Sequence, residues 1–191
     1  MPTANNVTVG KPKIGGAVYR APLGTALPTN ATSTLNSAFV ELGYVSEDGL
    51  VNSNSPESDV IRAWGGDIVY TVTEGRDDTF AFTLIESMKD AVLKAVYGDD
   101  KVTGSMAAGL SVQVTAEELP DAAWVFDMVL RNGALKRIVI PDGKITELGD
   151  ISYTDSDVTG YELTLTCMAD NSGVSHYEYL HDKVTGTTGT T

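Results

Sequence analysis

The sequence DIVYTVTEGRDDTFAFTL, residues 67–84, has the clearest two-residue alternation in the chain. Apolar residues recur at every second position in both of its halves: Ile68, Tyr70 and Val72, then Phe80, Phe82 and Leu84. A period of two is typical of a strand with one buried face. The short polar segment 75–78 predicts a hairpin turn, so we expect two paired strands that present their apolar faces to one core.

Further strands are expected on both sides of this region. The run 39–45 predicts an earlier strand, and apolar residues alternate again in 110–115, 124–130 and 161–168. Asn132-Gly133 is a strong hairpin-turn signal, and Pro141-Asp142-Gly143 predicts another turn. The 20 Val, 8 Ile and 22 Thr residues add to this β tendency, because side chains branched at Cβ fit a pleated surface.

One helix is predicted over residues 87–97. Ser87 followed by Asp90 resembles a capping box, apolar residues follow at helical spacing, and Gly98 is a plausible stop. Together these elements predict a mainly β fold, a sandwich or barrel of two antiparallel sheets with one flanking α-helix.

The chain divides into a body and two polar arms. Residues 1–15 are irregular and predict an N-terminal arm, 16–170 form the β domain, and 171–191 form a C-terminal arm that ends in a Thr/Gly-rich tail. Within the body, residues 49–66 are rich in Ser and Asn, which predicts a long loop.

Composition excludes several classes of protein. The single cysteine cannot form an internal disulfide, no stretch is long and apolar enough for a membrane span, and the start of the chain does not resemble a signal peptide. We therefore expect synthesis in the cytoplasm. A net charge of −13 disfavours tight nucleic-acid binding, because phosphates are repelled.

The residues that carry chemistry form no catalytic or metal-binding pattern. His176 and His181 lack metal-ligand spacing and are expected at the surface, and Cys167 lies on the apolar face of its strand. Asp155 and Asp157 lack the glycine and final glutamate of a calcium loop. We therefore expect a protein that is not an enzyme and that binds neither a cofactor nor a metal ion.

The order of four segments resembles the major tail (tail tube) proteins of long-tailed phages with non-contractile tails, and most closely those of phages that infect actinobacteria. The segments are APLGTALP at 21–28, FVELGYVSEDG at 39–49, IRAWGGD at 61–67 and TFAFTLIE at 79–86 with a helix after it. The resemblance covers about residues 17–170, and it lies in the order and spacing of the segments.

The resemblance implies a structural virion protein that self-assembles. Members of this family form hexameric rings that stack into a tube for DNA ejection, with strands of six subunits closing one inner barrel. A long loop and the arms join the rings, which here correspond to 49–66, 1–15 and 171–191. The implied partners are further copies of the chain, the tape measure protein, the tail terminator and baseplate or distal tail proteins, while DNA passes without specific binding.

Two sets of site residues follow from this hypothesis. The first is a set of candidates for contacts between subunits. Ile61, Trp64, Gly65 and Gly66 belong to it because a large side chain beside flexible glycines can reach a neighbour. Tyr177 and Tyr179 belong to it because they should anchor the C-terminal arm either to the body or to a neighbour. The second is a set of acidic candidates for the lumen: Asp67, Asp127 and Glu162. If the lumen is acidic, Lys136 and Arg137 should be turned away or paired.

Other readings of the sequence stay open at this point. A tail terminator, a capsid decoration protein or a secretion-type tube ring would share the β-rich pattern. A carbohydrate-binding β-sandwich would use Trp64 and Trp124 as stacking platforms.

Overall fold

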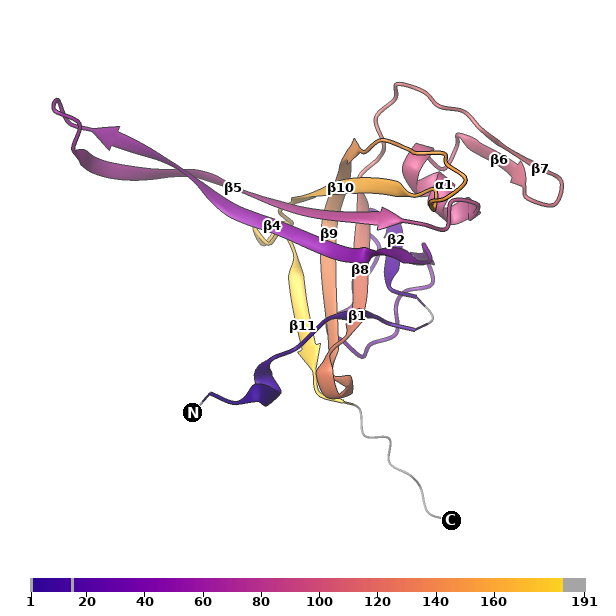
Figure 1. The fold of residues 1–191 in the computed structure, drawn as a ribbon, viewed down its shortest axis with the longest axis horizontal. Helices are drawn as coiled ribbons and strands as arrows, with labels where there is room; N and C mark the ends of the chain where they lie inside the picture. The colour runs from indigo at the N-terminus through magenta and orange to yellow at the C-terminus, as the bar shows by residue number, and fades with distance from the viewer. Residues whose placement is uncertain (1, 15, 184–191) are drawn as a thin grey trace, which may run out of the picture.

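A body of β-strands and one long hairpin that projects from it make up the protein in the computed structural model, which describes residues 2–14 and 16–183 (Figure 1). The strands are β1 (Lys11–Pro12), β2 (Val18–Pro22), β3 (Val40–Glu41), β4 (Val45–Arg62), β5 (Ile68–Leu84), β6 (Val102–Ser105), β7 (Gly109–Val112), β8 (Ala122–Val129), β9 (Leu135–Leu148), β10 (Tyr161–Met168) and β11 (Tyr177–His181). The helix α1 spans Asp90–Tyr97, and short 3-10 turns lie at Ala4–Asn6 and Arg131–Gly133.

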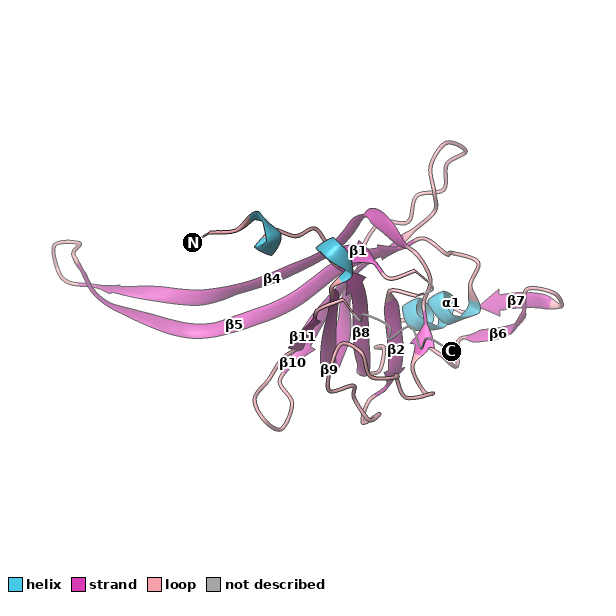
Figure 2. Cartoon of the chain, turned by 90° about the horizontal axis from the view of Figure 1, so that it is seen from below, coloured by secondary structure: helices cyan, strands magenta, loops and turns pink. Residues whose placement is uncertain are grey.

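Nine of the strands form one antiparallel sheet that is folded into two layers. The order is β3-β2-β8-β9-β10-β5-β4, with β1 added to β8 and β11 added to β9. The β4–β5–β10 layer crosses the β2–β8–β9–β11 layer at a steep angle (Figures 1 and 2). A separate pair, β6–β7, extends beside α1. The predicted mainly β fold of antiparallel strands with one flanking helix is confirmed, although the two packed layers belong to one continuous sheet and not to two separate ones.

The main core lies between these two layers, and aromatic side chains meet across it. Phe80 and Phe82 of β5 contact Phe126 and Trp124 of β8, with ring centroids 5.2 to 6.0 Å apart. The predicted alternation of β10 is confirmed, because the odd-numbered residues from Tyr161 to Cys167 are buried here. Helix α1 closes one end of the core with its buried side chains, Val92, Leu93, Ala95 and Val96.

The predicted turn at Pro141-Asp142-Gly143 is wrong, because β9 runs through it as one strand. Ala122 pairs with Gly143 and Trp124 pairs with Ile140, so β9 has one residue more than β8 over this stretch. Such a β-bulge bends a strand and increases its twist. Before the bulge β9 pairs with β8, and after it β9 pairs with β10. The bulge therefore carries the sheet from one layer into the other.

The hairpin also differs from the expectation. Residues 49–62 are not a loop, since β4 pairs with β5 over almost its whole length. The segment 75–78 is not a turn either, because β5 passes through it without a break. The chain reverses instead at residues 63–67, and the apolar side chains of Ile68 and Tyr70 are exposed rather than packed on the core.

The two arms are partly attached to the body. Lys11 and Pro12 pair with Met128 and Val129 of β8, and β11 pairs with the first part of β9. Helix α1 begins at Asp90 without a side-chain cap, so the predicted capping role of Ser87 is wrong. The Thr/Gly-rich tail, residues 184–191, lies outside the described residues.

The outer face of the β2–β8–β9–β11 layer has a second, smaller core. The segment between β2 and β3 covers this face and contributes Leu27, Leu35 and Phe39. These side chains pack on Val125 and Val139 of the sheet. This segment and the main core therefore cover the layer on both sides. Among the described residues, no strand or helix covers the outer face of the β4–β5–β10 layer and the end of β9.

Candidate assembly site

The tip of the β4–β5 hairpin bears an exposed apolar cluster far from the body (Figures 1 and 2). Trp64 is fully exposed, at 107% of the reference area, and Ile61 and Tyr70 lie opposite each other in the ladder at 51% and 64%. Ile68 and Val69 are also more than half exposed. We call these five residues the hairpin tip cluster.

The turn that carries Trp64 is held by its own backbone. The N–H of Ala63 donates to Asp67 O at 2.8 Å, and the N–H of Gly66 donates to Ala63 O at 3.0 Å. Gly65 and Gly66 have φ values of 129° and 97°, which residues with a Cβ atom rarely adopt. The predicted interface candidates Ile61, Trp64, Gly65 and Gly66 are thus gathered at one tip, with a defined conformation.

Two strand edges of the β4–β5–β10–β9 layer lack a partner. Within the chain as described, no strand pairs with the outer edge of β4. On the opposite side of the layer, β8 ends at Ala122, so no strand pairs with β9 on that side from Lys144 to Leu148. Unpaired edges offer rows of N–H and C=O groups to another chain.

The uncovered face of this layer is polar. Thr79, Ala81 and Thr83 of β5 alternate with the core residues, and Thr164 and Thr166 of β10 lie beside them. Thr166 hydrogen-bonds to Thr146 at 2.8 Å, between the two hydroxyls. The charged residues next to these side chains are Asp77, Lys144, Glu147 and Glu162. Lys144 is paired with Glu118 at 2.7 Å, so the face is acidic.

The three predicted lumen acids lie in different places. Glu162 is exposed on the uncovered face. Asp67 belongs to the hairpin turn and not to a strand. Asp127 is only 3% exposed, so its prediction as an acid that faces the lumen is wrong.

Asp127 instead belongs to a buried ion pair. Arg137 Nε and Nη2 donate to its two carboxylate oxygens at 2.6 and 2.8 Å, a bidentate geometry. Arg137 Nη1 also donates to the carbonyls of Asn30 and Ser33 at 3.1 and 2.7 Å. The pair therefore fixes the segment between β2 and β3 on the sheet. Lys136 is paired with Glu178 at 2.7 Å, as expected of the two basic residues.

Tyr177 and Tyr179 are stacked on each other on β11, with ring centroids 6.2 Å apart. Both pack on the second core, and the hydroxyl of Tyr177 donates to Asp170 at 2.7 Å. They attach the C-terminal segment to its own body, one of the two roles that the sequence left open for them. Neither tyrosine belongs to the hairpin tip cluster.

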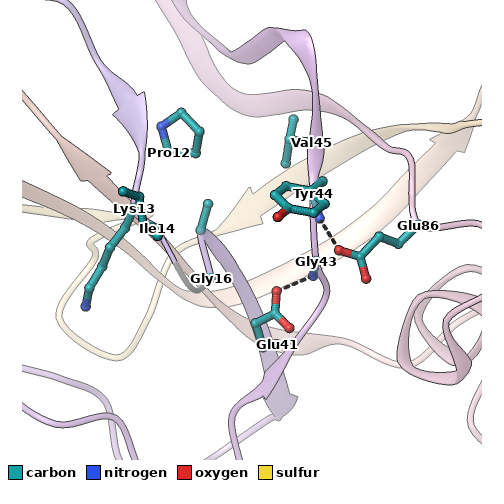
Figure 3. A pocket seen from close by; sticks show the side chains of 10 residues that line it. Pro12, Lys13, Ile14, Gly16, Glu41, Gly43, Tyr44, Val45 and Glu86 are labelled. Carbon is teal, nitrogen blue, oxygen red and sulfur yellow. Dashed lines mark hydrogen bonds between the residues drawn. The ribbon is translucent and has the colours of Figure 1, made fainter.

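Two carboxylates, Glu41 and Glu86, hold a sharp corner before β4 (Figure 3). The N–H of Gly43 donates to Glu41 at 2.6 Å, and the N–H of Tyr44 donates to Glu86 at 3.0 Å. Lys89 forms ion pairs with both acids, which raise its pKa against the effect of burial. The corner borders a cavity of about 380 Å³ and leaves Tyr44 72% exposed.

Sequence reasoning missed a buried polar contact where the hairpin leaves the body. Asp78 is 2% exposed, and it accepts from Asn52 Nδ2 at 2.8 Å and pairs with His176. The His176 side chain is 15% exposed and packs edge-on against Phe80, so its prediction as a surface histidine is wrong. The sequence did contain a signal for this contact, because Asp78 continues the alternating series of Phe80 and Phe82 and therefore falls on the buried face of the strand.

Other kinds of site find no support in the part of the chain that the structure describes. No group of three His, Cys, Asp or Glu side chains there could hold a metal ion, and none of its helices is long and apolar enough to cross a membrane. Trp124 is 1% exposed, so it cannot serve as the stacking platform of a carbohydrate site.

A comparison with protein families identifies the family to which the chain belongs. A family model described as phage tail tube protein matches residues 2–190, which include the body, the hairpin and both terminal segments. No curated protein matches the chain. Because the match covers nearly the whole chain, the protein belongs to the phage tail tube protein family, whose members are structural components of the virion tail and not enzymes.

Proposed function

We propose that copies of the chain close into hexameric rings through the free edges of β4 and β9, and that these rings stack into a tube that conducts DNA. The observation that supports this best is the pair of unpaired edges on opposite sides of one layer. The edges of β4 and β9 are different surfaces, so a contact between them joins copies head to tail. Such contacts form a closed ring when the rotation from one copy to the next adds up to a full turn.

The strand directions favour this contact. Each neighbouring pair in β4–β5–β10–β9 is antiparallel, so β4 and β9 run in opposite directions. A neighbour's β4 placed beside β9 therefore continues the antiparallel alternation. Leu50–Ser53 of β4 and Lys144–Leu148 of β9 lie at the same level of the layer, because both are linked through residues 79–84 of β5 and 161–166 of β10. Closure removes edges that would otherwise favour aggregation.

The same geometry favours one face of the layer as the lining of the bore. In a closed ring of these layers, the core face is covered by the β2–β8–β9–β11 layer of each copy. The uncovered face, with Glu147 and Glu162, then points inward. Acidic side chains there repel phosphate, which allows DNA to pass without strong binding.

The hairpin tip cluster and the terminal segments are the contacts that we propose between rings. The tape measure protein, the tail terminator and distal tail or baseplate proteins remain the proposed partners. The non-contractile tail and the actinobacterial hosts rest on the sequence resemblance alone and stay predictions.

Electron microscopy of the purified protein tests this proposal, with Trp64→Ala as the variant. We expect wild-type protein to form tubes of stacked six-fold rings. Truncation of a buried interface tryptophan costs about 2 kcal/mol or more, so the variant should need a much higher concentration to assemble. Because Trp64 is fully exposed in the single chain, the thermal transition of the monomer should not change.

Leu23→Ala is the control, because Leu23 is also an exposed apolar residue but lies outside the tip. Single rings without stacking would support a terminator-like role instead. A wild-type protein that stays monomeric under all conditions of concentration and salt would contradict the proposal.

A further inference from the structure

A groove between the two layers remains open in the single chain. It consists of two adjoining cavities of about 240 and 530 Å³, which share Gly10, Glu47, Gly49, Leu50 and Met128. Apolar side chains from both layers line it, Val18, Phe126 and Ile138 from one layer and Leu50 and Phe80 from the other. We call this hollow the inter-layer groove.

The hairpin tip cluster cannot reach the groove of its own chain. Asp78 is buried in the body, and the part of β5 from Ile68 to Asp77 lies beyond it. At about 3.3 Å per residue this part extends roughly 30 Å. Because β4 pairs with β5 along this length, the tip points away from the body (Figures 1 and 2). The exposed apolar side chains of the tip therefore need a surface on another molecule.

Unpaired charges flank both surfaces in a complementary way. Arg62 and Asp67 stand on the two sides of the turn that carries Trp64. Glu47 and Lys11 line the smaller cavity. All four are exposed, and none of them forms an ion pair with any described residue. The pairs of opposite sign that these residues can form are Arg62 with Glu47 and Asp67 with Lys11.

We propose that the hairpin tip cluster of one copy docks in the inter-layer groove of another copy, with Trp64 in the smaller cavity and the two charge pairs on its rim. This inference rests on the proposed self-assembly, and it assigns the surface that receives the tip. Tip and groove are different surfaces, so the contact is head to tail and propagates from copy to copy.

Disulfide cross-linking inside assembled tubes tests the proposal. The variant carries Cys167→Ala to remove the native thiol, together with Asp67→Cys and Lys11→Cys. A disulfide requires Cα atoms within about 7 Å. We expect a ladder of covalent multimers on a non-reducing gel after oxidation of tubes, and no ladder from dilute monomer. The control combines Asp67→Cys with Asp90→Cys, an exposed position on α1 outside the groove.

The outcomes separate this inference from the proposed function. Tubes that give no ladder, or an equal ladder with the control pair, would overturn the docking site and leave tube assembly standing. Wild-type protein that forms no tubes contradicts the proposed function itself.

A charge exchange gives a second test that does not depend on cysteines. Arg62→Glu or Glu47→Arg alone should raise the concentration needed for assembly at least several-fold, because each places like charges together. The double variant should restore assembly to near the wild-type level. A double variant that assembles no better than the single variants would overturn the proposed pairing.

Discussion

Single side chains fix the backbone at the corner that precedes β4. Glu41 and Glu86 hold the backbone of Gly43 and Tyr44 from two sides, and Lys89 forms ion pairs with both acids. Gly43 has a φ of 89°, and a Cβ at this position would overlap the Glu86 carboxyl group. The residue therefore satisfies two constraints, one of backbone conformation and one of space.

Gly43→Ala should destabilise the monomer more than Gly24→Ala. Gly24 has a similar φ of 83° but no atom within 4 Å of a Cβ built on it. Both variants should lose about 1 to 2 kcal/mol from left-handed backbone strain. Gly43→Ala should lose about 1 to 3 kcal/mol more, because Glu86 must leave its backbone partner. Urea unfolding measures both losses, and equal values would contradict the role of Glu86.

Cys167 should be unreactive in the folded protein. Burial, and secondarily the charge of Asp78, raises the pKa of its thiol from 9.0 to about 12. We expect iodoacetamide to modify Cys167 at pH 8.5 only after unfolding. Between pH 9 and 12 the unfolded chain loses this proton while the folded chain keeps it, so stability should fall as pH rises, by at most about 1.4 kcal/mol per pH unit.

Cys167→Ala is the matched control for this dependence. Tyr161 also has a pKa raised to about 12 by burial, and it remains in the variant. The free energy of unfolding of Cys167→Ala should therefore fall less steeply above pH 9 than that of the wild type. Identical slopes, or rapid native alkylation at pH 8.5, would show that the thiol is accessible.

At the scale of elements, β4 combines a paired edge with a free edge. Pro56 lies opposite Arg76 inside the β4–β5 ladder. Proline has no N–H, so it is tolerated in a sheet where that side of the residue faces away from its partner. We infer that Pro56 faces the free edge. Asn54 then has the same orientation, because the register does not shift between Leu50 and Glu57.

Asn54→Pro should block assembly without unfolding the monomer. It removes an N–H from the free edge of β4, whereas the control Ser53→Pro removes one that pairs with β5. We expect Asn54→Pro to retain the thermal transition of the wild type and to lose ring formation, as measured by electron microscopy. Ser53→Pro should lower the thermal transition. Normal tubes from Asn54→Pro would show that this edge is not an interface.

At the scale of the whole molecule, the net charge of −13 and the shape act together. The body has one uncovered, acidic sheet face, and the hairpin extends the molecule far beyond its core (Figure 2). Charges act on DNA in the bore only over about 8 Å at physiological ionic strength. The position of each acid therefore matters more than the total.

Charge reversal on the uncovered face should slow DNA release. We expect virions with Glu147→Lys and Glu162→Lys to eject DNA more slowly than the wild type, because the lumen then attracts phosphate. Asp90→Lys, on α1 and away from this face, is the control and should have little effect. Fluorescence of released DNA measures the rate, after microscopy has shown normal tails. Equal rates of DNA release from wild-type virions, the double variant and the Asp90→Lys control would mean that the acidity serves solubility only.

The sequence by itself determined the features that depend on neighbours along the chain. The alternation in 161–168 predicted the buried face of β10, and the helical spacing after Asp90 predicted the stripe of α1. Asn132-Gly133 predicted the reversal between β8 and β9, where Asn132 has a φ of 62°. Local patterns suffice in these places because one face of each element is buried and its period is therefore visible in the sequence.

Only the tertiary structure decided the hairpin, the bulge and the role of Asp127. Most of β4 is exposed on both faces, so it shows no apolar period and resembles a loop until β5 pairs with it. The turn residues at 141–143 form a bulge because β8 and β10 hold β9 on both sides of it. Asp127 is buried because Arg137, ten residues later in the sequence, lies opposite it in the sheet. These features depend on which strands meet, and that is set by long-range pairing rather than by local sequence.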